Sequence, residues 1–153
     1  MPKKATAADA ELILKLYDLR REAEIRKARN WWLVNFWPET IDDVMKVANA
    51  LGTQENAWFR QVIGYWELAA SLVLHGAAND TLFLEPAASG EMFLIFAKLH
   101  PFLKEIREKM NPGILKNAEA VIMKSKATRE RLASVEQRLL TRLKQMKQAA
   151  GRM

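Results

Sequence analysis

The side chains most capable of chemistry lie on a strongly apolar stretch, residues 57–75. This stretch predicts a helix that is apolar on almost every side and around which the rest of the chain packs. Positions three or four residues apart share one face of a helix. Five residues with these spacings interrupt the apolar surface: Arg60, Gly64, Glu67, Ser71 and His75. The last three supply an acid, a hydroxyl and an imidazole, the groups of a hydrolytic triad.

A structural role is the favoured interpretation of this polar stripe. Consecutive i+4 positions on one helix do not usually aim a nucleophile at a substrate, and no nucleophile elbow or oxyanion hole is apparent. We therefore predict a buried ion pair between Arg60 and Glu67. Ser71 is expected to bond to the backbone, and His75 to lie near the helix end, where it favours the helix dipole. A hydrolase using Glu67, Ser71 and His75 is the less favoured alternative.

Ligands for a metal ion are scarce in this sequence. The chain has no cysteine and two histidines, His75 and His100, neither of which belongs to a Glu-x-x-His pair. A carboxylate-bridged site in a helical bundle uses two such pairs. The six glycines form neither of the phosphate-binding patterns GxGxxG and GxxxxGK[ST]. The sequence therefore predicts no catalytic residue, no metal and no cofactor.

Positive charge is concentrated at the C-terminus. Residues 124–153 contain nine Lys or Arg and two Glu, so this segment carries +7, and the net charge of +6 leaves −1 for the rest of the chain. Phosphate groups attract such charge without sequence readout. The candidate contacts for an anionic partner are Lys124, Lys126, Arg129, Arg131, Arg138, Arg142, Lys144 and Lys147. The alternative is an ordinary solvated helix face.

An aromatic cluster follows a basic stretch near the N-terminus: Trp31, Trp32, Phe36 and Trp37. Basic and aromatic residues together are found in nucleic-acid stacking platforms and at membrane interfaces. Packing in the core against the aromatic residues of 57–75 is the favoured interpretation, because aromatic side chains dominate small cores. Trp31 or Trp37 remains a candidate for an exposed partner contact.

The amino-acid composition and the positions of glycine and proline predict an all-α fold. Helix-forming residues dominate, and most of the few glycines and prolines lie between apolar periodic segments. The prediction is a single domain, 1–153, with about five helices: a flexible arm at 1–6, then helices at 7–37, 41–51, 53–76, 91–110 (kinked by Pro101) and 114–149. A short helical turn is expected around Leu82–Leu84.

The last predicted helix is long for a compact domain of this size. About 36 residues at 1.5 Å each would span roughly 54 Å. Its apolar residues follow a near-heptad spacing typical of a coiled coil. We therefore predict that the helices at 7–37 and 114–149 pair antiparallel as a two-helix stem. If 114–149 projects freely instead, Leu132, Val135, Leu139 and Leu143 would require a second chain.

Three segments resemble a group of small helical bacterial proteins of unknown function: YWELAASLVLHG at 65–76, LF at 82–83 and HPFLKEIR at 100–107. The resemblance implies an uncharacterised bacterial cytoplasmic protein and assigns no functional residue. We expect a non-catalytic interaction or scaffold module whose partner is an unknown protein, or a second copy bound through the C-terminal helix. The alternative is a binder of nucleic acid or of an anionic membrane surface. Neither a signal peptide nor a transmembrane segment is expected.

Overall fold

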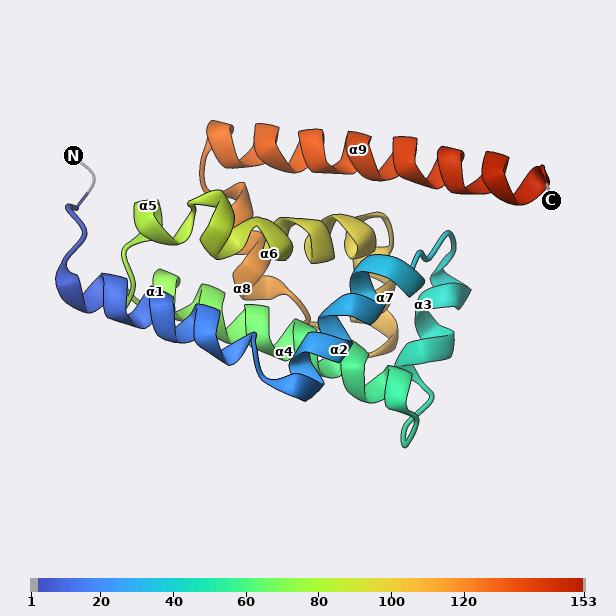
Figure 1. The fold of residues 1–153 in the computed structure, drawn as a ribbon, viewed down its shortest axis with the longest axis horizontal. Coiled ribbons are helices and arrows are strands. Elements are labelled where there is room, and N and C mark those ends of the chain that lie inside the picture. Colours follow the sequence, from blue (N-terminus) through green and yellow to red (C-terminus); the bar gives the residue numbers. More distant parts are fainter. Residues whose placement is uncertain (1–2, 153) are drawn as a thin grey trace.

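Helices are the only regular secondary structure in residues 3–152, the part that the computed structural model describes, which confirms the predicted all-α class (Figure 1). The helices are shorter and more numerous than the five predicted. The elements are α1 (Ala7–Leu19), α2 (Ala23–Asn30), the π-helical turn η1 (Trp31–Asn35), α3 (Ile41–Ala48), α4 (Gln54–Leu74), α5 (Asp80–Phe83), α6 (Pro86–Leu99), the 3-10 turn η2 (His100–Phe102), α7 (Leu103–Lys109), α8 (Lys116–Met123) and α9 (Lys126–Gly151).

The central helix is α4, as the sequence predicts. The hydroxyl of Thr53 accepts a hydrogen bond from the backbone N–H of Asn56 and starts the helix, and Gly76, with φ of 76°, follows its end. Helices α2 and α8 pack against α4. Its buried side chains are Asn56, Phe59, Val62, Ile63, Trp66, Ala69, Ala70 and Val73. This helix therefore anchors the elements on both sides of it.

The predicted N-terminal helix is divided into three parts. The chain turns after α1, and the carboxylate of Glu22 accepts from the N–H groups of Glu24 and Ile25 to start α2. At the other end of α2, the N–H of Phe36 donates to the carbonyl of Trp31 at 3.0 Å, a π-type bond that brings both aromatic rings into the core. The break lets the two helices bury separate apolar faces, with Leu16 buried in α1 and Ile25 and Ala28 buried in α2.

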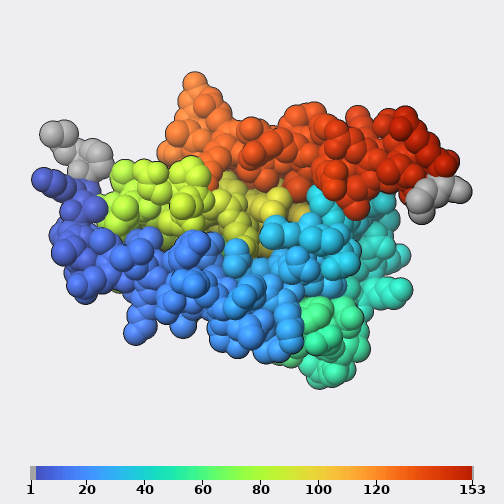
Figure 2. All heavy atoms as spheres, viewed as in Figure 1, coloured from blue at the N-terminus to red at the C-terminus, as the bar shows by residue number. Residues whose placement is uncertain are grey.

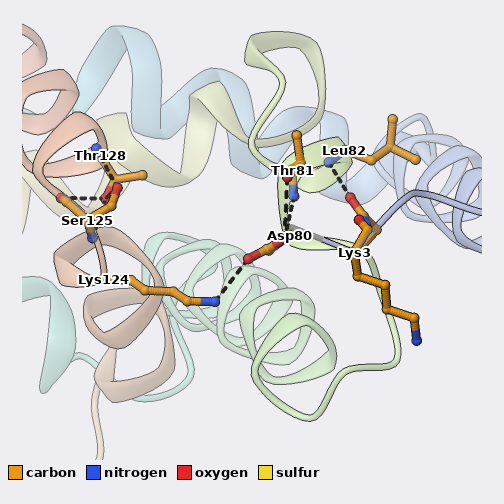
Figure 3. Close-up of polar contacts among 8 residues, drawn as sticks. Lys3, Asp80, Thr81, Leu82, Lys124, Ser125 and Thr128 are labelled. Carbon is orange, nitrogen blue, oxygen red and sulfur yellow. Dashed lines mark hydrogen bonds and ion pairs between the residues drawn. The ribbon is translucent and has the colours of Figure 1, made fainter. Parts of the chain in front are cut away.

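The predicted C-terminal helix is also divided, because Ser125 starts a new helix. Ser125 and Thr128 form a capping box, in which each side chain accepts from the other residue's backbone N–H (Figure 3). The chain turns between α8 and α9 at this point. As a result α8 packs on α4, whereas α9 runs along α6.

The predicted two-helix stem is therefore wrong. In Figure 1, α6 lies between α9 and α1, and the principal contacts of α1 are with α5. The apolar residues that would have formed the stem seam cover α6 instead: Leu132 and Val135 are buried there, and Leu139 is half-buried.

The remaining segments follow the predictions more closely. Pro101 interrupts the helix after Leu99, where η2 replaces α-helical geometry before α7 begins. The predicted turn near Leu82 is α5, which buries Phe83. Residues 1–2 of the predicted arm lie outside the described residues, and the carbonyl of Lys3 accepts from the side-chain amide of Asn79. None of the helices in 3–152 is both long and apolar enough to cross a bilayer.

Candidate functional site

The predicted buried pair between Arg60 and Glu67 does not exist. Arg60 is exposed, and its Nε donates to Oδ1 of Asn56 at 2.9 Å. Asn56 is fully buried and uses its amide nitrogen to bond the last carbonyls of α3, those of Val47 and Ala48. Arg60 is therefore part of a helix-end contact at the edge of the core.

Glu67 instead caps a different helix. Its carboxylate oxygens accept from the backbone N–H groups of Asn117 at 3.2 Å and Ala118 at 2.8 Å, at the start of α8. Leu115, with φ of 54°, precedes that helix and supplies no side-chain cap of its own. A carboxylate at a helix N-terminus satisfies free donors and interacts favourably with the helix dipole. Glu67 therefore joins α4 to α8.

Ser71 and His75 do not complete a catalytic arrangement with Glu67. The hydroxyl of Ser71 donates to the carbonyl of Leu68 at 2.6 Å, the predicted backbone bond, and His75 is exposed at the C-terminal end of α4. Within residues 3–152 no hydrogen bond joins Glu67, Ser71 and His75, and no group of three potential metal ligands is clustered. The stripe is thus a set of separate helix contacts.

Most of the predicted anion-contacting residues have partners within the chain. Lys124 pairs with Asp80 at 2.9 Å, which links the end of α8 to the start of α5 (Figure 3). Lys126 pairs with Glu130 at 3.7 Å, Lys147 pairs with Glu39, and Nη1 of Arg129 donates to the carbonyl of Met123. These cations are exposed, but each is used in a local contact.

Arg131 is built into the helix packing. Its guanidinium lies 4.0 Å from the centre of the Phe93 ring, and Nη1 donates to the carbonyl of Leu84 at 2.7 Å. Desolvation, followed by the positive charge of Arg138, lowers the pKa of Arg131. This arginine therefore holds α9 to α5 and α6.

Three of the eight candidates remain unengaged. Arg138, Arg142 and Lys144 are exposed, and in the described part of the chain they form no ion pair and no side-chain hydrogen bond. Arg131, Arg138 and Arg142 line one side of a groove of about 610 Å³ between α6 and α9, with Gly90, Leu94 and Trp37 among its other walls. We call this the arginine groove.

A second groove lies on the other flank of α9. It has a volume of about 530 Å³ and is lined by Leu139, Leu140 and Leu143 of α9, by Pro101 and Phe102 of η2, and by Trp37. Leu140 is 55% exposed on its rim. Glu136, also on the wall, pairs with Nδ1 of His100. We call this the leucine groove. Trp37 and Leu139 line both grooves and separate them.

Lys98, which sequence reasoning missed, holds the floor of the leucine groove. Its ammonium group donates to the carbonyls of Trp32 and Phe36 and lies 3.9 Å from the centre of the Trp37 ring. Only 6% of the residue is exposed. Burial lowers its pKa to about 8, although the two carbonyls and the ring favour the charged form. The sequence did offer a sign that Lys98 is buried, because it is the one charged residue in the otherwise apolar run Ile95–Leu99.

The aromatic cluster belongs mainly to the core, as predicted. Trp32 is fully buried and stacks on Phe59 with ring centres 5.3 Å apart, and Trp31 is buried as well. Trp37 is the exception, because it remains half-buried between the grooves. The sequence analysis had left Trp31 and Trp37 as alternative candidates for an exposed contact with a partner.

A buried polar network centred on Glu91 was not foreseen. Glu91 accepts from Nε of Arg29 at 2.6 Å and from Nε1 of Trp66 at 3.2 Å. Beside it, the hydroxyl of Tyr65 donates to the carbonyl of Leu16, and burial raises the pKa of Tyr65 to about 12. The network connects α1, α2, α4 and α6, so its role is to fix the helices behind the grooves.

Residues 5–125 match the family described as a domain of unknown function, DUF4760. This chain belongs to the DUF4760 family. The family membership confirms the resemblance seen in the sequence to small helical proteins of unknown function. No curated protein and no solved structure matches the chain.

The DUF4760 match ends at Ser125, the residue that caps α9. The matched region therefore contains α1 to α8 and supplies one wall of each groove, while α9 supplies the opposite wall. In this DUF4760 protein the two grooves depend on a helix that follows the matched region.

Proposed function

We propose that the protein is a non-catalytic interaction module that binds an amphipathic helix of another protein in the leucine groove. The observation that carries the proposal is the exposure of Leu140, at 55%, beside the apolar walls formed by Leu143, Phe102 and Pro101. Amphipathic helices bind other proteins by inserting apolar side chains into grooves of this kind. An exposed apolar rim is also a feature of partner surfaces.

Charge favours an acidic partner over a second copy of this chain. The two acids that line the leucine groove, Glu39 and Glu136, are paired with Lys147 and His100. The neighbouring cations of α9, Arg138, Arg142 and Lys144, form no ion pair among the described residues. Two α9 helices placed side by side would bring like charges together, which is unfavourable. A partner helix with acidic residues flanking its apolar face would complement these cations. A cytoplasmic location is part of the same proposal and is compatible with a chain that lacks cysteine.

The test uses two labelled amphipathic peptides with the same leucine face, one flanked by glutamates and the other by lysines. Fluorescence anisotropy should show binding of the acidic peptide and at least tenfold weaker binding of the basic one. Leu140→Asn should weaken binding of the acidic peptide at least tenfold. The matched control is Leu68→Asn, because Leu68 is 60% exposed on α4, away from the groove.

Three results would contradict the proposal. Equal binding of both peptides would contradict the preference for an acidic partner, and an unchanged affinity in Leu140→Asn would remove the leucine groove as the site. Sedimentation of the chain as a dimer that Leu140→Asn dissociates would assign the surface to a second copy. Retention on DNA or anionic vesicles that depends steeply on salt and on Arg138, Arg142 and Lys144 would favour the alternative function.

A further inference from the structure

The arginine groove combines an apolar floor with uncompensated positive charge. Its apolar walls come from Pro86 and Leu94 of α6, Val135 and Leu139 of α9, and Trp37. Its remaining lining residues are Gly90 and three arginines, so none of the described residues lining it carries a negative charge. In Figure 2, α9 forms a ridge beside the recessed surface of α6.

The three arginines differ in how they are held. Arg131 is fixed by the Leu84 carbonyl and the Phe93 ring, whereas Arg138 and Arg142 have no ion-pair or hydrogen-bond partner among residues 3–152. Arg138 and Arg142 are four residues apart on one helix, a spacing at which like charges repel. An anion bound between them would relieve this repulsion.

We propose that the arginine groove binds a single-chain anionic amphiphile, with its alkyl chain along Leu94, Val135 and Leu139 and its headgroup at Arg138 and Arg142. A guanidinium group binds carboxylate or phosphate oxygens in a bidentate manner. The volume of about 610 Å³ falls within the usual range of small-molecule sites, about 300–1,000 Å³. The proposal does not rest on the partner helix in the leucine groove, but the two ligands would share Arg138 and Arg142, and Trp37 and Leu139 line both grooves.

Gly90 allows the apolar part of the site to be tested separately from its charge. A Cβ atom built at Gly90 meets only Nη2 of Arg131, at 3.8 Å, so the space beside this residue is open. Because Gly90 lines the groove, the larger side chain of Gly90→Leu would occupy the space assigned to the alkyl chain. This substitution removes none of the three arginines, so it leaves the charge of the groove unchanged.

Isothermal titration calorimetry of the full chain with dodecanoate, below its micelle concentration, tests the proposal. We expect one site per chain, with at least tenfold weaker binding of acetate, which lacks the chain, and of dodecyl maltoside, which lacks the charge. Arg138→Gln/Arg142→Gln should weaken dodecanoate binding at least tenfold, and so should Gly90→Leu. The control Lys126→Gln/Lys144→Gln removes the same charge outside the groove and should bind dodecanoate as the parent does.

Several outcomes would overturn the proposal. Equal weakening by the control variant would show nonspecific attraction to the basic helix, and equal binding of dodecyl maltoside would show an apolar site without charge recognition. Binding to anionic vesicles without binding of free dodecanoate would assign the arginines to a membrane surface. Leu140→Asn should leave dodecanoate binding unchanged, so failure here and failure of the partner-helix proposal are distinguishable.

Discussion

The ammonium nitrogen of Lys98 lies 3.9 Å from the centre of the Trp37 indole ring. The same ammonium group donates to two backbone carbonyls, that of Trp32 within η1 and that of Phe36 directly after it. A residue of α6 thus closes the C-terminal end of the π-helical turn and also supports the side chain that separates the two grooves. The contact links the core to the proposed binding surface.

Removal of the Lys98 ammonium should destabilise the protein. Lys98→Met keeps most of the aliphatic chain but leaves two backbone carbonyls without their donor, which is expected to cost about 1–3 kcal/mol per unsatisfied buried group. Urea unfolding at pH 7 measures the loss. An unchanged midpoint would show that solvent or a rearranged backbone satisfies these carbonyls.

The pH dependence of stability should carry a signature of Lys98. Its pKa is about 8 in the folded protein, against a usual value of 10.5, so between these values the unfolded chain retains a proton that the folded chain has lost. The free energy of unfolding should therefore rise from pH 8 to about 10, by at most about 3 kcal/mol. Comparison with Lys98→Met separates this rise from the titration of other groups. If the free energy of unfolding changed with pH equally in the parent and in Lys98→Met, the lowered pKa of Lys98 would be contradicted.

Trp66 should be one of the most costly residues to truncate. It is 1% exposed on α4 and its Nε1 donates to Glu91, so Trp66→Ala should lower the free energy of unfolding by about 3–5 kcal/mol. The matched control is Leu68→Ala on the same helix, where high exposure predicts a change within about 0.5 kcal/mol. Similar losses in the two variants would refute the assignment of α4 as the central helix.

Glu67 should contribute as a helix cap and not as an ion-pair partner of Arg60. Glu67→Ala should cost about 0.5–2 kcal/mol, the usual range for a lost cap, and Glu67→Gln less, because the amide keeps an acceptor oxygen. A double-mutant cycle between positions 60 and 67, followed by chemical unfolding, should give a coupling energy near zero. A coupling above about 1 kcal/mol would restore the ion pair that the sequence predicts.

The packing of α9 on α6 predicts opposite results for two leucines of one helix. Leu132 is buried against the core, so Leu132→Ala should cost about 2–5 kcal/mol. Leu140 is on the groove rim, so Leu140→Ala should change stability by less than about 1 kcal/mol. Thermal unfolding of the two variants tests which face of α9 packs on α6. If Leu140→Ala proved the more damaging, α9 would be rotated from the orientation described.

The sequence by itself determined the class of fold and the central helix. Apolar periodicity and side-chain caps act over three or four neighbouring residues, so they are readable without a structure. The helices predicted at 41–51 and 53–76 begin at Ile41 and Gln54, after the caps Thr40 and Thr53, and Pro101 interrupts the helix at 91–110 as predicted. The break at Ser125 was missed because Thr128 takes the place that Glu or Gln occupies in the usual capping-box pattern.

Only the tertiary structure decided which elements meet. Glu67 and Ala118 are 51 residues apart, and Lys98 and Trp32 are 66 apart, and nothing local distinguishes these partners from other donors and acceptors. A carboxylate can satisfy an arginine or a helix N-terminus equally well in chemical terms, and an apolar helix face can cover α1 or α6. The turn between α8 and α9 selects α6, and that choice places Arg138 and Leu140 on the two grooves.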